Sequence, residues 1–474
     1  MDFIIAEAIS HEPIITDEGV KLYHARALDS TSPKHTAFVE MLDKNGLFPF
    51  VRIGQYLAHY LKYDQPIVFV TDWEEPVELF GLRLEIKGKD VDYPNLGFTA
   101  FYTDWDNLSI TVDLFAHEFS HVWIYWLGMD WSLSLANKFH TSTSITDFYM
   151  AFSEGFAEWL EIVTKDLRGY RFKDGELWDY GYDGNALISQ RDQQLRYHAV
   201  KNNRFIYQSA VPYAEDFSST YANLHMAHIT STAFTPERLK NGSQILSSEG
   251  AVASIFFQIY VHEMFKNTYE NEDFYVAFGA TSQELTPIEN LLLKILYAMA
   301  KIDMKQPSLM TDFIVSYGKC FPMEKEEIYN VFTKTTHFAT VSPEARELFG
   351  EIYRVGRIGD VASAVDLIKN ARTPLVADLR MKLLEGNLEL DNAVYDEIWV
   401  TGDKEIPPTP WELSITVRYR FNINTATAID FMAINNVTLD IGERLVIARE
   451  SQNGFDSADE FWNLKHSLCM QSRA

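Results

Sequence analysis

The sequence predicts an α+β fold: a small mixed sheet with an exposed edge strand, then a mainly helical region, then a small all-α module. Short runs rich in β-branched and aromatic residues are concentrated before residue 113 and indicate strands. From Asp113 onward, apolar residues recur at helical spacing. Near the C-terminus, Pro407, Pro408 and Pro410 interrupt this pattern and predict a linker before the last module.

The first part of the chain is expected to mix helices and strands. Ser32-Pro33 is typical of a helix start, and Val51–Tyr63 has the apolar spacing of a helix. Strands are expected at Ile67–Thr71, Leu79–Ile86, Gly97–Tyr102 and Leu108–Val112.

The region after Asp113 is expected to be helical. Asp113–Leu127 is strongly apolar and ends before Gly128, a common helix stop. A second helix is predicted from about Ile145 to Leu167, with Ser144 or Thr146 as its N-cap. Further helices are expected at Gly250–Phe265, at Pro287–Lys301 with a capping box of Thr286 and Glu289, at Lys325–Thr333, at Pro343–Val355 and at Asp360–Ala371. Residues 168–245 receive no assignment.

With 474 residues, the chain exceeds the size of one ordinary domain. We expect residues 1–112 to form an N-terminal α+β subdomain and residues 113–345 a mainly helical subdomain. Residues 346–410 are expected to form a helical connector and linker, and residues 411–474 the C-terminal module.

The composition narrows the classes of partner. Apolar residues make up 47% of the chain, which is enough for a packed core and excludes general disorder. The net charge of −26 disfavours nucleic acid and anionic membranes as main partners, because like charges repel. This negative charge favours solubility of the protein and, secondarily, basic peptides as substrates. No apolar stretch is long enough to span a bilayer, so we expect no membrane span.

The cysteines and the N-terminus indicate the cellular compartment in which the protein is expected. Cys320 and Cys469 are far apart and form no CxxC pair, so neither a thiolate metal site nor a disulfide framework is indicated. The N-terminus lacks the basic residues that open a signal peptide. We expect a cytoplasmic protein, although a mature exported chain is also compatible with these features.

The segment HEFSH has the pattern of a metal site. On a helix, His117 and His121 are four residues apart and project from one face, which suits two nitrogens binding one Zn²⁺. Glu118 lies beside them and can reach a water on the metal. The flanking residues are apolar almost all round, which predicts a buried helix where unpaired polar groups are costly. The alternative is a surface helix that carries these residues by chance.

The next predicted helix offers a third ligand. Glu154 and Glu158 are again four residues apart, and Gly155 and Ala157 keep the helix slim enough to approach the HEFSH helix. We expect Glu154 to bind zinc and Glu158 to accept a hydrogen bond from a ligand imidazole. The alternative is a solvated glutamate pair.

These two motifs together resemble a known family. HEFSHVW followed by SEGFAEWLE resembles the gluzincin metallopeptidases, particularly the aminopeptidase N type, whose pattern is HELxHxW and then WLNEGFA. The resemblance implies one Zn²⁺ per chain, with His117, His121 and Glu154 as ligands and Glu118 as general base. The substrate would be a peptide or protein.

The resemblance also implies where the substrate lies. Gly97–Tyr102 and Leu108–Val112 resemble the edge strand along which gluzincins bind an extended peptide. A second oxyanion donor, usually Tyr or His, is expected downstream of the ligands. Several residues qualify, and the sequence does not choose among Tyr221, His225, His228, Tyr260 and His262.

The chain departs from that family in two ways. Thirty-two residues separate His121 from Glu154, against eighteen in aminopeptidases of that type, so roughly Met129–Thr143 must loop out. The amine-binding GxMEN motif is absent, which favours an endopeptidase over an exopeptidase. Metzincins are excluded because no HxxGxxH follows Glu118, and His140 is a poor third ligand.

The C-terminal module resembles a second family. Phe421–Phe455 is similar to the helix-hairpin-helix of ComEA-type DNA receptors, through Asn422–Ala426 and Asn453–Phe455. That family has a Gly-Ile-Gly hairpin for phosphate, where this chain has Asn436-Val437-Thr438 in acidic surroundings. We therefore expect a module that packs or contacts a protein partner and not DNA.

Three functions follow from the motifs. The first is an active zinc endopeptidase. The second is a non-catalytic zinc-containing protein that docks protein or DNA through its C-terminal module, and the third is a zinc hydrolase of a non-peptide amide or ester. Glu118 favours an enzyme, because a structural zinc site has no need of a carboxylate beside its ligands.

Overall fold

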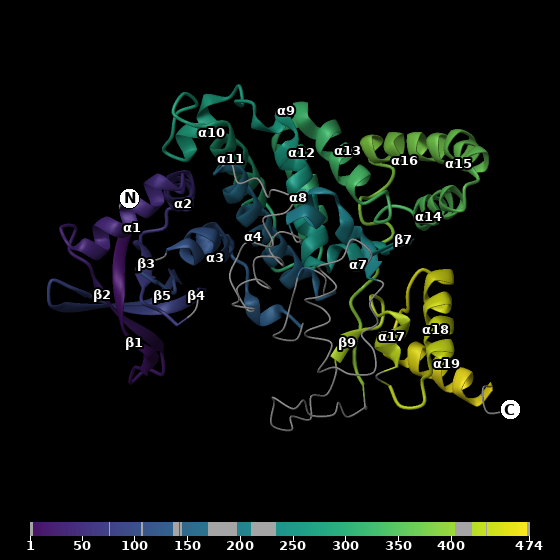
Figure 1. The fold of residues 1–474 in the computed structure, drawn as a ribbon, viewed down its shortest axis with the longest axis horizontal. Helices are drawn as coiled ribbons and strands as arrows, with labels where there is room; N and C mark the ends of the chain where they lie inside the picture. The colour runs from purple at the N-terminus through teal and green to yellow at the C-terminus, as the bar shows by residue number, and fades with distance from the viewer. Residues whose placement is uncertain are drawn as a thin grey trace, which may run out of the picture.

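The computed structural model describes residues 3–74, 76–105, 108–135, 142, 145–168, 197–209, 234–402, 420–432 and 434–471. It shows an α+β protein in which an N-terminal mixed sheet of five strands is followed by a mainly helical region (Figure 1). This confirms the predicted fold class at that level. Among the described helices, none combines the length and the apolar character that crossing a bilayer requires.

The five N-terminal strands close into a small barrel. They are β1 (Phe3–Ile15), β2 (Lys21–Ala27), β3 (Ile67–Thr71), β4 (Val77–Ile86) and β5 (Lys89–Ala100). Their order is β1-β2-β4-β5-β3, with antiparallel pairing at β1–β2 and β4–β5 and parallel pairing elsewhere. A barrel of so few strands has a narrow interior. Ala6, Ala25 and Ala100 therefore share that interior with larger residues such as Leu82 and Phe98.

Strand β3 connects the barrel to the helices. Val68 and Val70 face the barrel interior, whereas Ile67 and Phe69 belong to the large core formed with the helices. The Phe69 ring lies 5.1 Å from that of Phe115 and 5.0 Å from that of Phe119, both on α3 (Ser109–Trp126). Being buried on both faces, β3 fixes α3 between the barrel and the helical region (Figure 1).

A bulge at Gly81 frees one end of β4. Gly81 has φ +80°, and a Cβ there would lie 2.3 Å from the Lys21 carbonyl oxygen, so only glycine fits. Beyond the bulge, β4 pairs with β2 from Leu82 to Glu85. Before it, Val77–Phe80 pairs with β5 alone among the described strands. Within the described part of the chain, this segment therefore has a strand partner on one side only, and we refer to its other side as the free edge of β4.

Two predictions for the edge strand are wrong. Leu108–Val112 is not a strand, because α3 begins at Ser109 and the Val112 N–H donates to the Leu108 carbonyl at 3.0 Å. Its β-branched residues favour a strand locally, but burial against the barrel decides for a helix. Gly97–Tyr102 is not an edge either, since Thr99 and Ala100 pair with β3 as well as β4.

The helical region follows α3. It comprises α4 (Phe148–Leu167), α7 (Gly242–Leu246), α8 (Glu249–Val261), α9 (Glu263–Lys266), α10 (Glu272–Ala277), α11 (Pro287–Met299), α12 (Leu309–Cys320), α13 (Lys325–Thr335), α14 (Pro343–Arg357), α15 (Val361–Leu367), a π turn at Ile368–Arg372 and α16 (Thr373–Glu385). Two more helices, α1 (Pro33–Lys44) and α2 (Phe48–Leu61), cover the barrel. A small two-stranded sheet joins β6 (Tyr207–Ser209) to β7 (Phe234–Leu239).

Several predicted helix ends can be compared with the structure. Ser32 caps α1, and Thr286 with Glu289 forms the capping box of α11, as predicted. Asp147 caps α4, in place of Thr146; Ser144 lies outside the described residues. The single helix expected at Gly250–Phe265 is divided between α8 and α9, because His262 is extended.

Helix α4 is packed between α3 and α8. A Cβ at Gly155 would lie 2.6 Å from the Cβ of Val252 and 2.7 Å from the Glu249 carbonyl oxygen, both on α8. Gly155 therefore allows a close approach of α4 to α8, while α4 also packs against the HEFSH helix α3, as predicted.

The C-terminal module has its own apolar cluster. It contains β8 (Trp399–Thr401), β9 (Arg420–Asn422), α17 (Ala428–Phe431), α18 (Leu439–Ser451) and α19 (Ala458–Gln471). The Asn424 Oδ1 accepts from the Phe455 N–H at 2.8 Å, and its Nδ2 donates to the Phe455 carbonyl at 3.0 Å. The two motifs that carry the helix-hairpin-helix resemblance thus hold each other in place.

The module is docked onto the helical region through Glu450 of α18. Its carboxylate accepts from Arg346 of α14 at 2.5 Å and from the Asn241 amide at 3.1 Å. Burial raises the pKa of Glu450, but the charges of Arg449 and Arg346 and the hydrogen bond from Asn241 outweigh it and lower that pKa. The module therefore contacts its own chain through a half-buried ion pair.

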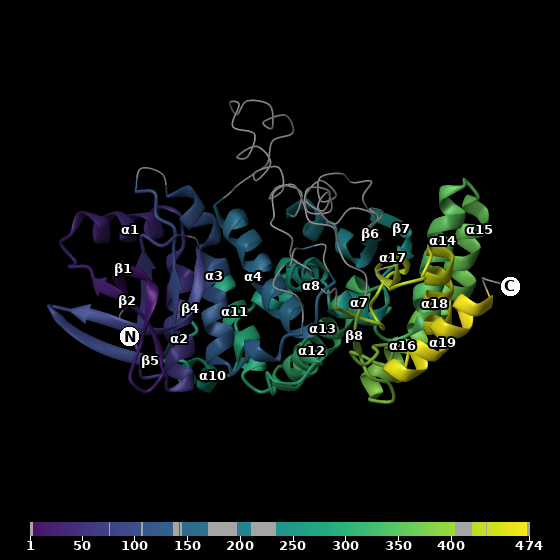
Figure 2. The same ribbon diagram turned by 90° about the horizontal axis from the view of Figure 1, so that it is seen from below.

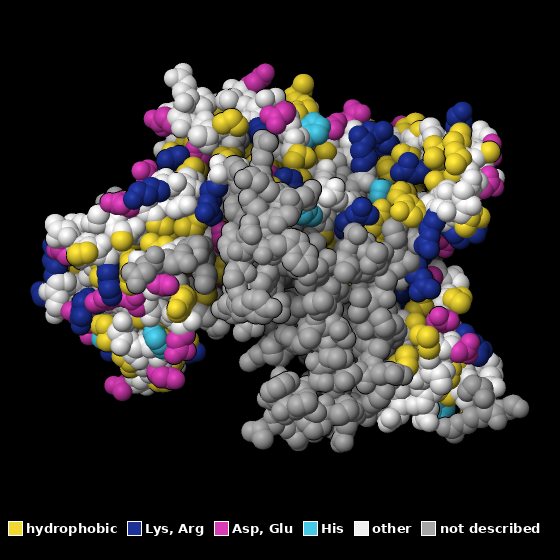
Figure 3. All heavy atoms as spheres, viewed as in Figure 1, with side chains coloured by type: hydrophobic (Ala, Val, Ile, Leu, Met, Phe, Trp, Pro, Cys, Tyr) yellow, Lys and Arg dark blue, Asp and Glu magenta, His cyan; other side chains and the backbone are white. Residues whose placement is uncertain are grey.

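Charge is spread over the described surface. In Figure 3, Asp and Glu side chains are scattered over both the barrel and the helices on the face shown. Among the described residues of this face, the acidic side chains are not gathered into one patch.

We predict that Gly155→Ala lowers the free energy of unfolding by roughly 1–3 kcal/mol, because the methyl group overpacks the α4–α8 contact. Gly356→Ala on α14 is the matched control. Its new Cβ meets only Ala364 at 3.9 Å, so it should be neutral or stabilise by up to about 1 kcal/mol. Chemical denaturation of both variants tests this, and equal stability of the two would contradict the packing argument.

Candidate metal centre

Helices α3 and α4 bring three ligand side chains together. The His117 Nε2 lies 3.5 Å from one oxygen of Glu154, and the His121 Nε2 lies 3.6 Å from the other. One ligand atom from each residue lies within 4.8 Å of the other two. His117 and His121 share one face of α3, with ring centroids 5.2 Å apart, as their spacing predicts.

These distances suit a small tetrahedral cation. Two ligand atoms that each lie 2.0–2.1 Å from one Zn²⁺ are about 3.4 Å apart when the geometry is tetrahedral. The two nitrogen–oxygen distances are close to this separation. Two imidazoles and one carboxylate are also a common donor set of catalytic zinc sites.

Burial makes a bound cation favourable. The His121 side chain is 2% exposed, Glu154 is 8% exposed and Glu118 is 9% exposed. Groups this buried are stable only when they are paired. Burial by itself lowers the pKa of His117, but the hydrogen bond to Glu154 and the charges of Glu118 and Glu161 outweigh it and raise that pKa to about 9. The carboxylates thus favour positive charge at this point.

His121 is oriented by the residue before the third ligand. Its Nδ1 is hydrogen-bonded to the Ser153 Oγ at 2.9 Å, which leaves Nε2 facing Glu154. The Trp131 ring packs beside the imidazole, with centroids 5.6 Å apart. A single stretch of α4 therefore supplies both a ligand and the group that orients another.

His117 is backed by Glu161, where Glu158 was predicted. The Glu161 Oε2 lies 3.8 Å from the His117 Nδ1, and its other oxygen accepts from Lys165 at 2.5 Å. Glu158 accepts from the Ser142 hydroxyl, and no described hydrogen bond or ion pair joins it to either imidazole. A helix turns about 100° per residue, so the seventh residue after Glu154 returns within about 20° of its direction, and the fourth deviates by about 40°.

Glu118 faces the free edge of β4. Ligand atoms of Glu118, His121 and Glu78 lie within 4.8 Å of one another, and Glu78 belongs to the Val77–Phe80 segment. Burial chiefly raises the pKa of Glu118, and the charges of Glu78 and Glu154 add to this, while the two imidazoles oppose it. The side of the site that carries the candidate base therefore adjoins the Val77–Phe80 segment of β4.

Two of the predicted oxyanion donors, Tyr260 and His262, lie within the described residues and contact other side chains there. The Tyr260 ring packs 6.5 Å from that of Trp159, and burial raises its pKa to about 12. His262 is paired with Glu327 at 2.9 Å. The other candidates, Tyr221, His225 and His228, lie outside the described residues, as does His140.

Comparison of the chain with protein-family models, curated proteins and solved structures finds no significant match in any of them. The functional interpretation therefore depends on the geometry of the site and on the motifs.

We predict that Glu161→Gln weakens zinc binding by roughly 10–100-fold, because the imidazole of His117 loses its carboxylate partner. Glu158→Gln, a buried carboxylate on the same helix, is the matched control and should leave zinc affinity unchanged. Competition with a fluorescent chelator measures both.

The Glu161→Gln variant also leaves Lys165 buried beside a neutral group, which by itself destabilises the fold. The double variant Glu161→Gln/Lys165→Met should recover stability without recovering zinc affinity. Recovery of both would show that Glu161 acts on the fold alone, and equal losses in Glu161→Gln and Glu158→Gln would restore the role predicted for Glu158.

Proposed function

We propose that this chain is a zinc-dependent metallopeptidase, of gluzincin type, that cleaves within peptide chains. The observation that carries the proposal is the convergence of His117, His121 and Glu154 around one point, with the Glu118 carboxylate next to it on α3. A structural metal site would use the same ligands but would have no need of Glu118. This favours an enzyme over the alternative of a non-catalytic docking protein.

The residues divide the chemistry as follows. The two histidines and Glu154 would hold a zinc ion, which would supply a Lewis acid that polarises a carbonyl and lowers the pKa of water toward ~7. Glu118 would accept the proton of the attacking water and then transfer it to the leaving amine. The hydrogen bond from Ser153 would orient the His121 imidazole toward the metal, and the Glu161 carboxylate lies 3.8 Å from the His117 Nδ1, where it would support that ring.

The free edge of β4 supports a peptide as substrate. The Val77–Phe80 segment has a strand partner on one side only among the described residues, and its Glu78 lies near Glu118. An extended peptide can add to such an edge through main-chain hydrogen bonds, which places its backbone across the site. Non-peptide amides and esters lack this repeating backbone, so the edge favours peptides over them.

A second candidate activity is removal of N-terminal residues. Glu78 favours it, because a carboxylate beside the base can bind the free amine of a substrate. The absence of the GxMEN motif and the long spacing between His121 and Glu154 support internal cleavage instead.

The C-terminal module supports a contact with protein and not with DNA. The hydroxyl of Thr438 accepts from the Ile441 N–H at the start of α18, and Asp440 adds negative charge to that helix end. Both occupy the position where a phosphate would bind. The module's Glu450 already binds the helical region.

We predict that Glu118→Gln retains one zinc per chain but lowers the turnover of a quenched peptide library by at least ~10²-fold, because proton transfer is lost while the ligands remain. Metal analysis and the cleavage assay are run on the same preparation. Glu326→Gln, on the exposed side of α13, is the matched surface control and should match the unmodified protein. Cleavage that persists in Glu118→Gln would overturn the mechanism.

We predict that Glu78→Gln changes kcat/KM by the same factor for peptides with free and with acetylated N-termini. Internal cleavage makes no use of the terminal amine, whereas an N-terminal exopeptidase would bind it through a carboxylate. A loss confined to free-amine peptides would instead establish the aminopeptidase alternative and assign Glu78 to amine binding.

A further inference from the structure

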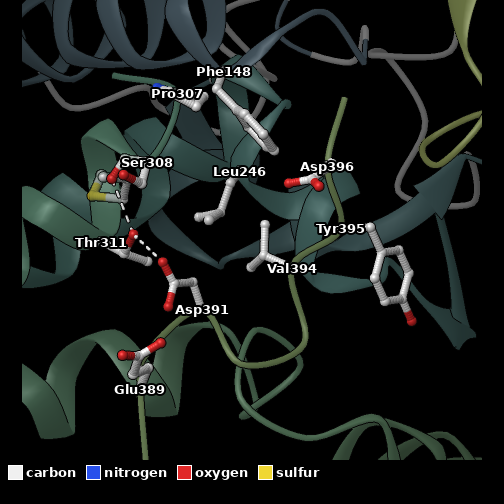
Figure 4. Close-up of a pocket in the computed structure, with 11 residues that line it drawn as sticks. Phe148, Leu246, Pro307, Ser308, Thr311, Glu389, Asp391, Val394, Tyr395 and Asp396 are labelled. Atoms are coloured by element: carbon white, nitrogen blue, oxygen red, sulfur yellow. Dashed lines mark hydrogen bonds between the residues drawn. The ribbon is translucent and has the colours of Figure 1, made fainter. Parts of the chain in front are cut away.

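A cavity of about 250 Å³ lies between the helical region and the segment Glu389–Asp396, which leads to the C-terminal module. Its walls come from the first residue of α4, from α7, from the start of α12 and from that segment (Figure 4). Phe148, Leu246 and Met310 are buried and form an apolar interior. The cavity is separate from the residues of the candidate metal centre.

The mouth of the cavity is acidic. Glu389, Asp391 and Asp396 line it; Glu389 and Asp396 are exposed, and Asp391 is half-buried. Asp391 accepts a hydrogen bond from the Thr311 hydroxyl at 3.2 Å, which holds its carboxylate at the rim (Figure 4). Among the described residues that line the cavity, none is Lys, Arg or His, so the lining carries no cationic side chain.

A buried carboxyl adjoins the cavity wall. The Phe148 N–H donates to the Glu397 carboxyl at 3.3 Å. Burial, and then the charge of Asp147, raise the pKa of Glu397 to about 8. This carboxyl is therefore mostly uncharged at pH 7, and the negative charge of the cavity comes from the acidic residues of its own lining.

We propose that this cavity binds an organic cation with a short alkyl body, of the size of a lysine or arginine side chain. Its volume is below the ~300–1,000 Å³ typical of sites for larger small molecules, which limits the ligand to a group of that size. The alkyl part packs against Phe148, Leu246 and Met310, and the cationic head lies near the carboxylates of the lining, Asp391 and Asp396. This site does not depend on the proposed peptidase activity.

The cavity also lies where three parts of the chain meet. Phe148 opens α4, the helix that carries Glu154 six residues later. Tyr395 lines the cavity and contacts the C-terminal module, since a Cβ at Gly454 would lie 2.9 Å from its ring. The proposed ligand thus contacts both the helix that supplies a zinc ligand and the support of the C-terminal module.

The test compares butylguanidinium with butylurea, its neutral analogue of nearly the same shape, by ligand-observed NMR titration of the full chain at low ionic strength. We expect saturable binding of butylguanidinium, at least ~10-fold tighter than that of butylurea. Raising the salt concentration should weaken it, because the carboxylates at the mouth are accessible to ions. Equal binding of the two compounds would overturn the proposal.

Variants assign the binding to this cavity. Asp391→Asn and Asp396→Asn should each weaken butylguanidinium binding by roughly 3–10-fold, and Leu246→Phe should abolish it by filling the interior. Glu326→Gln on α13 removes one exposed charge elsewhere and should have no effect. The two Asn variants change no side-chain volume, so they stay informative if Leu246→Phe fails to fold. Unchanged binding in both Asn variants, or an equal loss in Glu326→Gln, would refute a site at this cavity.

Discussion

The pairing of buried charges between α3 and α4 is the constraint on which the rest of the site depends. Several ionisable groups in this interface face a counter-group: Glu154 faces both imidazoles, and Glu161 lies near His117 and is paired with Lys165 on its own helix. An unpaired charge at such depth costs several kcal/mol, on the order of 3–5 when one partner of a buried pair is removed. The two helices therefore cannot slide or rotate without separating several pairs at once.

This interface is supported by apolar packing on both of its outer sides. On one side, Phe115 and Phe119 of α3 pack on Phe69 of the barrel. On the other side, Gly155 lets α4 approach α8 so closely that no side chain fits between them. The candidate ligands are thus carried by two helices fixed between rigid neighbours, which is what a metal site with little tolerance in distance requires.

The part of this site that a single helix determines could be predicted from the sequence, and the part that depends on distant elements could not. The spacing of His117 and His121 places their rings on one face, and the structure has them there. Glu78 comes from a strand forty residues away in the chain, and nothing in its neighbourhood marks it. The position of Glu161 near His117 had a local signal, since seven residues match the helical repeat better than four.

The strands show the same limit, because features that depend on distant segments could not be predicted from the sequence. Ile67–Thr71 was predicted with its correct bounds, because a short apolar run buried on both faces is evident from its residues alone. The long strand β1 and its partner β2 were not predicted, because closure of the barrel depends on pairing between segments far apart in the chain. The prediction of a strand at Leu108–Val112 failed because the burial of α3 outweighs the local preference of β-branched residues.

The two resemblances carry unequal weight, and the structure explains the difference. In the C-terminal module, the matching residues stabilise the fold, since Asn424 forms hydrogen bonds that join two segments of the backbone. The hairpin position that would hold phosphate differs from that of the family. That likeness therefore bears on fold more than on function. In the metal centre, the matching residues are the donor groups themselves, and they converge within 4.8 Å. A likeness carried by reacting groups in suitable geometry bears on chemistry, which is why the metallopeptidase proposal follows from the site and DNA binding does not follow from the module.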